Sequence, residues 1–205
     1  MIRPAARLIA LICVLGFAPA ALAAAAHQIR VRIEPDTQRL EGQDSISFDV
    51  PRAATLALSV QLQLESLAVD GRRIEPQARL DGRLQHFVLP AAGRIEVRWS
   101  GTLAALDRSL DHRGTLSYDQ AASSKDGTFL PAGSGWYPQV EGALARYSVD
   151  LNLPEDQRGL VPGRLIDEKQ ADGRYSARFE FKQPAEDISL MAGPYRIGER
   201  RVRTA

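Results

Sequence analysis

Apolar and polar residues alternate along most of this chain. The clearest alternating runs are 27–33, 46–50, 56–64, 84–89, 95–99, 147–153 and 175–181. A period of two places every second side chain on one face of an extended strand. Turn residues separate the runs, most clearly the Asp-Gly pairs at 70–71 and 81–82. Many short strands at such spacing predict an all-β fold, an antiparallel β-sandwich.

Several strand boundaries follow from the same pattern. We expect Pro51 and Pro90 to end strands, because proline has no N–H to donate to a neighbouring strand. The run 56–64 is long enough either to bend over two sheets or to continue as one strand. A hairpin is expected around Ala171-Asp172-Gly173, and two further strands at 188–192 and 195–197.

The segment 104–135 breaks the alternation and accumulates Asp, Ser, Gly and Thr. We interpret it as one long irregular loop, of a length that is uncommon in compact domains unless the loop is functional or mobile. Residues 121–127 read as its polar part, and a short helix fits around 104–110.

The first 23 residues have the composition of a secretory signal peptide. Arg3 and Arg7 precede a short apolar run at 8–17, and an A-x-A cleavage signal ends at Ala23. An uncleaved N-terminal anchor is the alternative. We expect an exported protein, periplasmic or extracellular, with no membrane span after signal removal and one β-sandwich domain over 27–200. The single cysteine, Cys13, would leave with the signal, which removes disulfide and thiolate chemistry.

Charge gives no indication of a nucleic-acid partner. The chain has 26 basic and 25 acidic residues, and neither sign dominates along it. The only basic cluster, Arg200, Arg201 and Arg203, reads as a solvated chain end.

No residue pattern predicts a metal site. His27, His86 and His112 lack the i, i+4 spacing of zinc-binding helices and are interpreted as unrelated surface residues. Oxygen ligands for calcium are available in the long loop, but their spacing matches no calcium-binding loop. We therefore interpret these residues as solvated: Asp107, Asp111, His112, Asp119 and Asp126.

Other candidates for catalysis also fail on pattern, so no catalytic residue is assigned. Gly133-Ser134-Gly135 lacks the strand-turn-helix frame of a nucleophilic serine. Glu186 and Asp187 would face opposite sides of a strand. Trp136 and Tyr137 would either stack on a sugar or peptide or belong to the core, and we favour the core.

The order of features resembles the N-terminal domain of the aminopeptidase N (membrane alanyl aminopeptidase) family of zinc metallopeptidases. The matching features are the 27–33 strand followed by Glu34-Pro35, the 67–74 hairpin, the 94–103 strand, Gly127-Thr128-Phe129-Leu130, Trp136-Tyr137-Pro138, the 147–154 strand, Val161-Pro162-Gly163 and the 190–195 strand. The resemblance implies a saddle-like β-sandwich. The zinc signature H-E-x-x-H of that family is absent from the 205 residues.

Departures from the family pattern fall where the resemblance would place substrate binding. The family holds the substrate's amino group with a Gln-x-Glu element, but residues 129–135 contain no Gln, Glu or Arg. Gln139 replaces the usual Cys. No substrate-binding residue is therefore carried over, which suggests a divergent bacterial branch or a domain relieved of peptide binding.

The resemblance implies a non-catalytic domain, truncated or stand-alone, that scaffolds or caps a metallopeptidase domain. Zinc would belong to that missing domain, so no cofactor is expected in this chain. The expected partner is the catalytic domain or another protein. A carbohydrate- or protein-binding module of the cell envelope is the alternative, and an enzyme in its own right would need a constellation that the sequence does not show.

Overall fold

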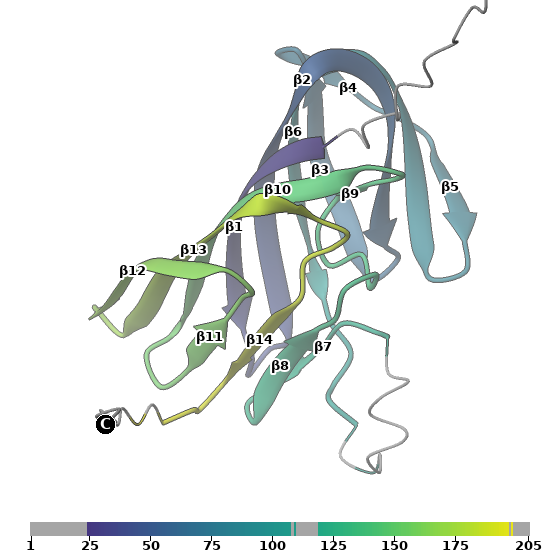
Figure 1. The fold of residues 1–205 in the computed structure, drawn as a ribbon. Helices are drawn as coiled ribbons and strands as arrows, with labels where there is room; N and C mark the ends of the chain where they lie inside the picture. Colours follow the sequence, from purple (N-terminus) through teal and green to yellow (C-terminus); the bar gives the residue numbers. More distant parts are fainter. Residues whose placement is uncertain (1–23, 108, 110–118, 197, 199–205) are drawn as a thin grey trace, which may run out of the picture.

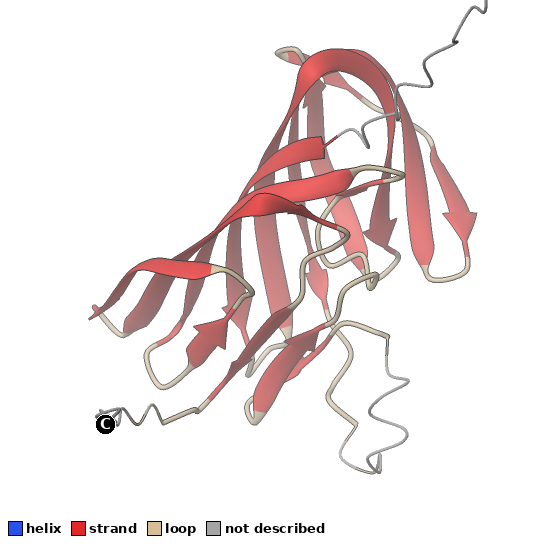
Figure 2. Cartoon of the chain, in the orientation of Figure 1, coloured by secondary structure: helices blue, strands red, loops and turns tan. Residues whose placement is uncertain are grey.

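The computed structural model describes residues 24–107, 109, 119–196 and 198. Every regular element within them is a β-strand, and the strands form two sheets (Figure 2). The predicted all-β, sandwich-like fold is confirmed.

Ten of the strands in the described residues form the larger sheet, in the order β12-β13-β10-β1-β2-β6-β3-β4, with β5 on β6 and β9 on β2 (Figure 1). Their bounds are β1 Ala24–Glu34, β2 Arg39–Ser59, β3 Leu62–Val69, β4 Arg72–Ile74, β5 Ala78–Asp81, β6 Leu84–Thr102, β9 Gln139–Val140, β10 Leu144–Pro154, β12 Arg164–Ala171 and β13 Arg174–Ala185. One pair, β1 with β10, is parallel. The larger sheet is therefore mixed, and it departs from the predicted antiparallel sandwich in this one strand pair.

The smaller sheet has the order β11-β14-β8-β7 and is antiparallel. Its strands are β7 Ala122–Ser124, β8 Gly127–Leu130, β11 Arg158–Leu160 and β14 Leu190–Gly193. Two of them, β7 and β8, lie inside the expected loop 104–135. Residues 121–123 are buried rather than part of a polar loop, and the described residues 104–107 and 109 are not helical. Small side chains explain why β7 was missed, because Ala and Ser carry a weak apolar signal.

The core lies between the two sheets and follows the predicted alternation. The inward residues of β1, Ile29, Val31 and Ile33, are almost fully buried. The inward residues of β6 and β10 are also buried: Ile95, Val97, Trp99, Tyr147, Val149, Leu151 and Leu153. The residues between them point away from the core, so the larger sheet has a polar outer face.

Two prolines do not end strands as expected. β2 runs through Pro51 and β6 runs through Pro90. The register between β2 and β6 shifts between Ser47 and Arg52, and again between Arg52 and Ala54. A bulge leaves residues outside the ladder, so a missing N–H is tolerated there. The strand bends at this place (Figure 1), and Val50 is 72% exposed instead of sharing the buried face of its run.

The run 56–64 is neither one strand nor a bend over two sheets. A turn at 60–61 separates β2 from β3, and both strands pair with β6. The hairpin at Asp70-Gly71 is confirmed, with positive φ angles of 47° and 79° that suit a two-residue turn. The hairpin at residues 172–173 is confirmed too, and β5 and β6 form a further hairpin around a turn at 82–83.

At the end of the chain, β14 begins only at Leu190. Tyr195 and Arg196 are not in a strand, and Ile197 lies outside the described residues. The signal segment 1–23 and Arg200, Arg201 and Arg203 also lie outside them, so the signal peptide and the bounds 27–200 stay predictions. Over the described residues, no helix is long and apolar enough to cross a membrane.

Candidate functional site

Trp136 and Tyr137 lie in the core, where Trp136 connects the larger sheet to the segment that leads into β14. Their exposed fractions are 0% and 2%, and their ring centroids are 4.9 Å apart. The indole N–H of Trp99 donates to the Trp136 carbonyl at 3.0 Å, and the indole N–H of Trp136 donates to the Ile188 carbonyl at 2.8 Å. The interpretation of both aromatic residues as core residues is confirmed, and neither offers an exposed stacking surface.

Asp187 fastens the segment before β14 to the loop that follows β8. Its carboxylate accepts hydrogen bonds from the Tyr137 hydroxyl at 2.6 Å, the Gln139 amide at 2.6 Å, the Ile188 N–H at 2.8 Å and the Gly133 N–H. Four such bonds use the acceptor sites of a carboxylate. Asp187 therefore has no acceptor site left for the ammonium group of a substrate.

The hydroxyl of Tyr137 is held in its donating form. Burial, followed by the nearby charge of Asp187 and the hydrogen bond to it, raises the pKa of Tyr137 well above its usual value. A neutral phenol is the state that donates to a carboxylate.

The expectation that Glu186 and Asp187 are strand residues was wrong. They lie between β13 and β14, with Glu186 exposed and Asp187 partly buried. Their side chains differ in surroundings because Asp187 is hydrogen-bonded to the loop that follows β8, whereas Glu186 points to solvent. Apart from the adjacent Ile188, the partners of Asp187 come from about 50 residues earlier, so no local sequence signal identifies its role.

His27 is buried, which corrects its interpretation as a surface residue. It falls on the apolar face of β1 and is 3% exposed. Its Nδ1 lies 2.6 Å from Oδ2 of Asp44, and the Gln28 N–H donates to the other carboxylate oxygen at 2.9 Å. The imidazole and the Tyr137 ring are nearly perpendicular, with centroids 5.5 Å apart. A paired polar group thus lies beneath the buried aromatic pair.

The remaining histidines differ. His86 pairs with Glu141 and its side chain is 15% exposed, so it is mostly covered rather than facing solvent. His112 lies outside the described residues.

The acidic residues of the long loop do not converge where they are described. Asp107 accepts from the Ser109 hydroxyl at 2.6 Å, and Asp119 pairs with Arg83. The described residues contain no group of three or more His, Cys, Asp or Glu side chains placed to hold a metal ion. Asp126 lies in the turn between β7 and β8. Asp111 lies outside the described residues, as His112 does.

Ser134 is engaged in the fold of its own loop. It is 7% exposed, and its hydroxyl donates to the Pro131 carbonyl at 2.7 Å. Within the described residues, Ser134 has no hydrogen bond to a histidine.

The smaller sheet carries an apolar row on the face that points away from the core. Leu160 pairs with Met191 and Met191 with Phe129 across three strands. Leu160 is 60% and Met191 41% exposed, whereas Leu190 and Ala192, on the opposite face of β14, are buried. Phe129 is partly buried. We call Leu160, Met191 and Phe129 the apolar row.

Comparisons with known proteins rest on structure. No family model matches the chain, and no curated protein matches it in sequence. Among solved structures it is similar to an M1 zinc metallopeptidase from Deinococcus radiodurans, with 15% identity and a TM-score of 0.61, over 82% of this chain and 41% of that one.

A mutant of the Deinococcus radiodurans enzyme bound to a Tyr-Ser-Ala substrate matches over the same shares, with 14% identity and a TM-score of 0.60. A two domain M1 zinc metallopeptidase mutant bound to L-tryptophan matches equally, at 14% and 0.60. The chain spans about two fifths of the length of these proteins. Such a likeness shows the fold: the chain has an M1 peptidase-like fold.

Proposed function

We propose that this chain is a non-catalytic, exported β-domain that scaffolds or caps a zinc metallopeptidase domain. It would correspond to the N-terminal domain of aminopeptidase N-like enzymes, in a divergent bacterial branch. The observation that carries the proposal is the match in fold, which covers 82% of this chain but only 41% of the similar metallopeptidase. In this proposal the catalytic zinc belongs to the remaining part of such a protein.

The polar groups around Trp136-Tyr137-Pro138 support a structural role. The carboxylate of Asp187 accepts four hydrogen bonds from its own chain, and the hydroxyl of Ser134 is bound to a carbonyl. A general acid or base must reach a substrate proton with a free donor or acceptor position. These groups instead hold residues 129–135 in place, the stretch that the family resemblance aligns with the substrate-binding element of the enzymes.

The apolar row supplies a surface for the metallopeptidase domain. Exposed apolar side chains that form a continuous strip on a sheet are typical of a face covered by another domain. Phe129, one member of the row, begins the 129–135 stretch that the resemblance places beside the substrate. We therefore propose that the metallopeptidase domain packs on the apolar row, with residues 129–135 at the rim of its active site.

The proposal predicts that the chain alone has no peptidase activity. Residues 24–205 are purified, supplied with zinc and assayed with fluorogenic aminoacyl substrates, beside a complete zinc aminopeptidase under the same conditions. We expect no hydrolysis above the blank by the chain and rapid hydrolysis by the control enzyme. Hydrolysis by the chain that a chelator abolishes and zinc restores would show that it is an enzyme.

A further inference from the structure

The outer face of the larger sheet contains a polar groove that the proposed function does not use. Its volume is about 530 Å³, and it crosses the sheet from β13 to β4. Strand register places one row of side chains along it, in the order Arg178, Asp150, Arg30, Gln43, Arg98 and Ser66. A parallel row adds Gln28, Ser45 and Ser148, so the lining combines guanidinium groups with amides and hydroxyls.

Positive charge exceeds negative charge in this groove. Its lining contains five arginines and three acids. One acid, Asp44, is buried and paired with His27 on the core side of the sheet. Asp150 is shared, since it binds Arg178 at 2.5 and 2.7 Å and lies 3.7 Å from Arg30.

Two of the guanidinium groups are available to a ligand. Arg98 and Arg73 are both exposed and form no ion pair within the described residues, although each lines the groove. Arg94, in contrast, lies 3.2 Å from Glu96. The groove therefore contains fixed positive charge that the described residues leave uncompensated.

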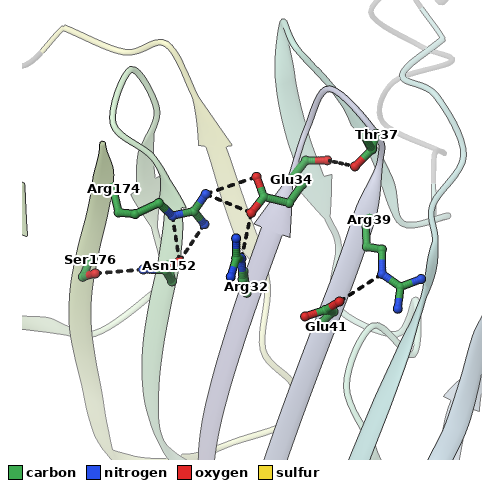
Figure 3. A network of polar contacts seen from close by, with 8 residues as sticks. All are labelled: Arg32, Glu34, Thr37, Arg39, Glu41, Asn152, Arg174 and Ser176. Carbon is green, nitrogen blue, oxygen red and sulfur yellow. Dashed lines mark hydrogen bonds and ion pairs between the residues drawn. The ribbon is translucent and has the colours of Figure 1, made fainter. Parts of the chain in front are cut away.

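The neighbouring end of the same face shows that this excess is local. There the arginines are neutralised, as Figure 3 shows. Glu34 accepts hydrogen bonds from Arg32 at 2.7 Å and from Arg174 at 2.8 Å, and Glu41 accepts one from Arg39 at 3.0 Å. Uncompensated arginine thus distinguishes the groove from this neighbouring end of the outer face.

We propose that the groove binds an anionic oligosaccharide that carries carboxylate groups. Guanidinium groups bind carboxylates through paired hydrogen bonds, and the amides of Gln28 and Gln43 and the hydroxyls of Ser45 and Ser148 suit sugar hydroxyls. Residues two strands apart in a row are separated by roughly 10 Å. This is about the spacing of β6 from β4, the strands that carry Arg98 and Arg73, and it allows two carboxylates of one chain of sugars to be bound.

Other polymers fit the groove less well. Apart from β4, which ends the sheet, the strands that line the groove each have a partner on both sides, so an extended peptide lying on the groove floor finds no free backbone edge to extend the sheet. None of the described residues that line the groove is aromatic, so nucleobases find no stacking surface. A sugar chain requires neither feature.

The test is calorimetric titration of residues 24–205 with a short oligogalacturonate at low salt. The methyl-esterified oligosaccharide is the matched neutral ligand. We expect saturable binding of the acid form only, weakened about tenfold or more by Arg98→Gln and by Arg73→Gln, the scale of a lost charge-assisted contact. Arg79→Gln is the matched variant: Arg79 is exposed in β5, has no ion pair in the described residues and does not line the groove.

Each other outcome overturns the proposal. Absence of binding by the wild-type chain shows that the groove is not such a site. Equal losses in Arg79→Gln and Arg98→Gln show that attraction is unspecific. Binding of polyglutamate but not of oligogalacturonate assigns the groove to acidic peptides. Thermal unfolding of each variant confirms that it is folded, and none of these outcomes depends on whether the chain partners a peptidase.

Discussion

Replacing Asp187 by Asn tests whether its carboxylate fastens the Trp136-Tyr137-Pro138 segment to the rest of the fold. The substitution keeps the shape of the side chain but removes its charge. It also replaces one oxygen by an NH2 group, which donates rather than accepts. The four donors that now converge on Asp187 can no longer all be paired.

The cost follows from these contacts. The Asn oxygen can still accept from Tyr137 and Ile188, but the bond from Tyr137 is no longer charge-assisted. The amide of Gln139 can rotate and present its oxygen to the new NH2 group, whereas the N–H of Gly133 faces a donor and loses its partner. A lost bond to a charged group and an unpaired donor each cost on the order of 1–3 kcal/mol. We expect the free energy of unfolding to fall by about 2–4 kcal/mol.

Urea unfolding of both proteins measures this change, and Glu186→Gln is the matched control. Glu186 is the adjacent carboxylate, is exposed and has no hydrogen-bond or ion-pair partner in the described residues. Its substitution removes the same charge and should change stability by no more than about 0.5 kcal/mol. Amide exchange at Gly133 should also become faster. Equal stabilities of the Asp187 and Glu186 variants would refute the fastening role.

Two further substitutions test the sheet itself. Gly42→Ala should destabilise the fold by about 1–3 kcal/mol, because the added methyl group would overlap the buried indole of Trp99; Gly93→Ala, whose new Cβ has no neighbour closer than 3.7 Å, is the control in thermal unfolding. Arg174→Gln should cost about 1 kcal/mol near neutral pH. Burial acts to raise the pKa of Glu34, but the hydrogen bonds and charges of Arg32 and Arg174 outweigh it and lower the pKa below its usual 4.5. The contribution of a carboxylate with a lowered pKa is fully present above pH 4.5 and disappears as pH falls through the folded value. Urea unfolding across that range should therefore show the Arg174→Gln difference shrinking in acid, and a difference that grows in acid would contradict the assignment.

The sequence pattern predicted the parts of the fold that depend on local alternation. Ile29, Val31 and Ile33 alternate with polar residues, and all three are buried as expected. The Asp70-Gly71 turn is equally local, because positive φ angles suit these two residues. Pro51 and Pro90 misled the assignment of strand ends. A proline ends a ladder only where its N–H is needed, and a register shift between β2 and β6 removes that need.

The site depends on contacts that the sequence does not encode locally. Asp187 meets Tyr137 across 50 residues and Gly133 across 54. His27 sits on the apolar side of a correctly predicted strand, which was the one available signal that it is buried. Its partner Asp44 also falls on the inner side of β2, and only the pairing of β1 with β2 brings the two together.

The central claim is that a metallopeptidase domain packs on the apolar row, and cross-linking in the native cell tests it most directly. A photoreactive residue is placed at Met191, and at Leu80 as a control, since Leu80 is 70% exposed but lies in β5 on the other sheet. The peptides attached to each position are identified by mass spectrometry. We predict that position 191, and not position 80, becomes attached to a polypeptide that carries His-Glu-x-x-His, whether in the same chain or in another. Equal attachment at both positions, or attachment at 191 only to polypeptides without that motif, would contradict the claim.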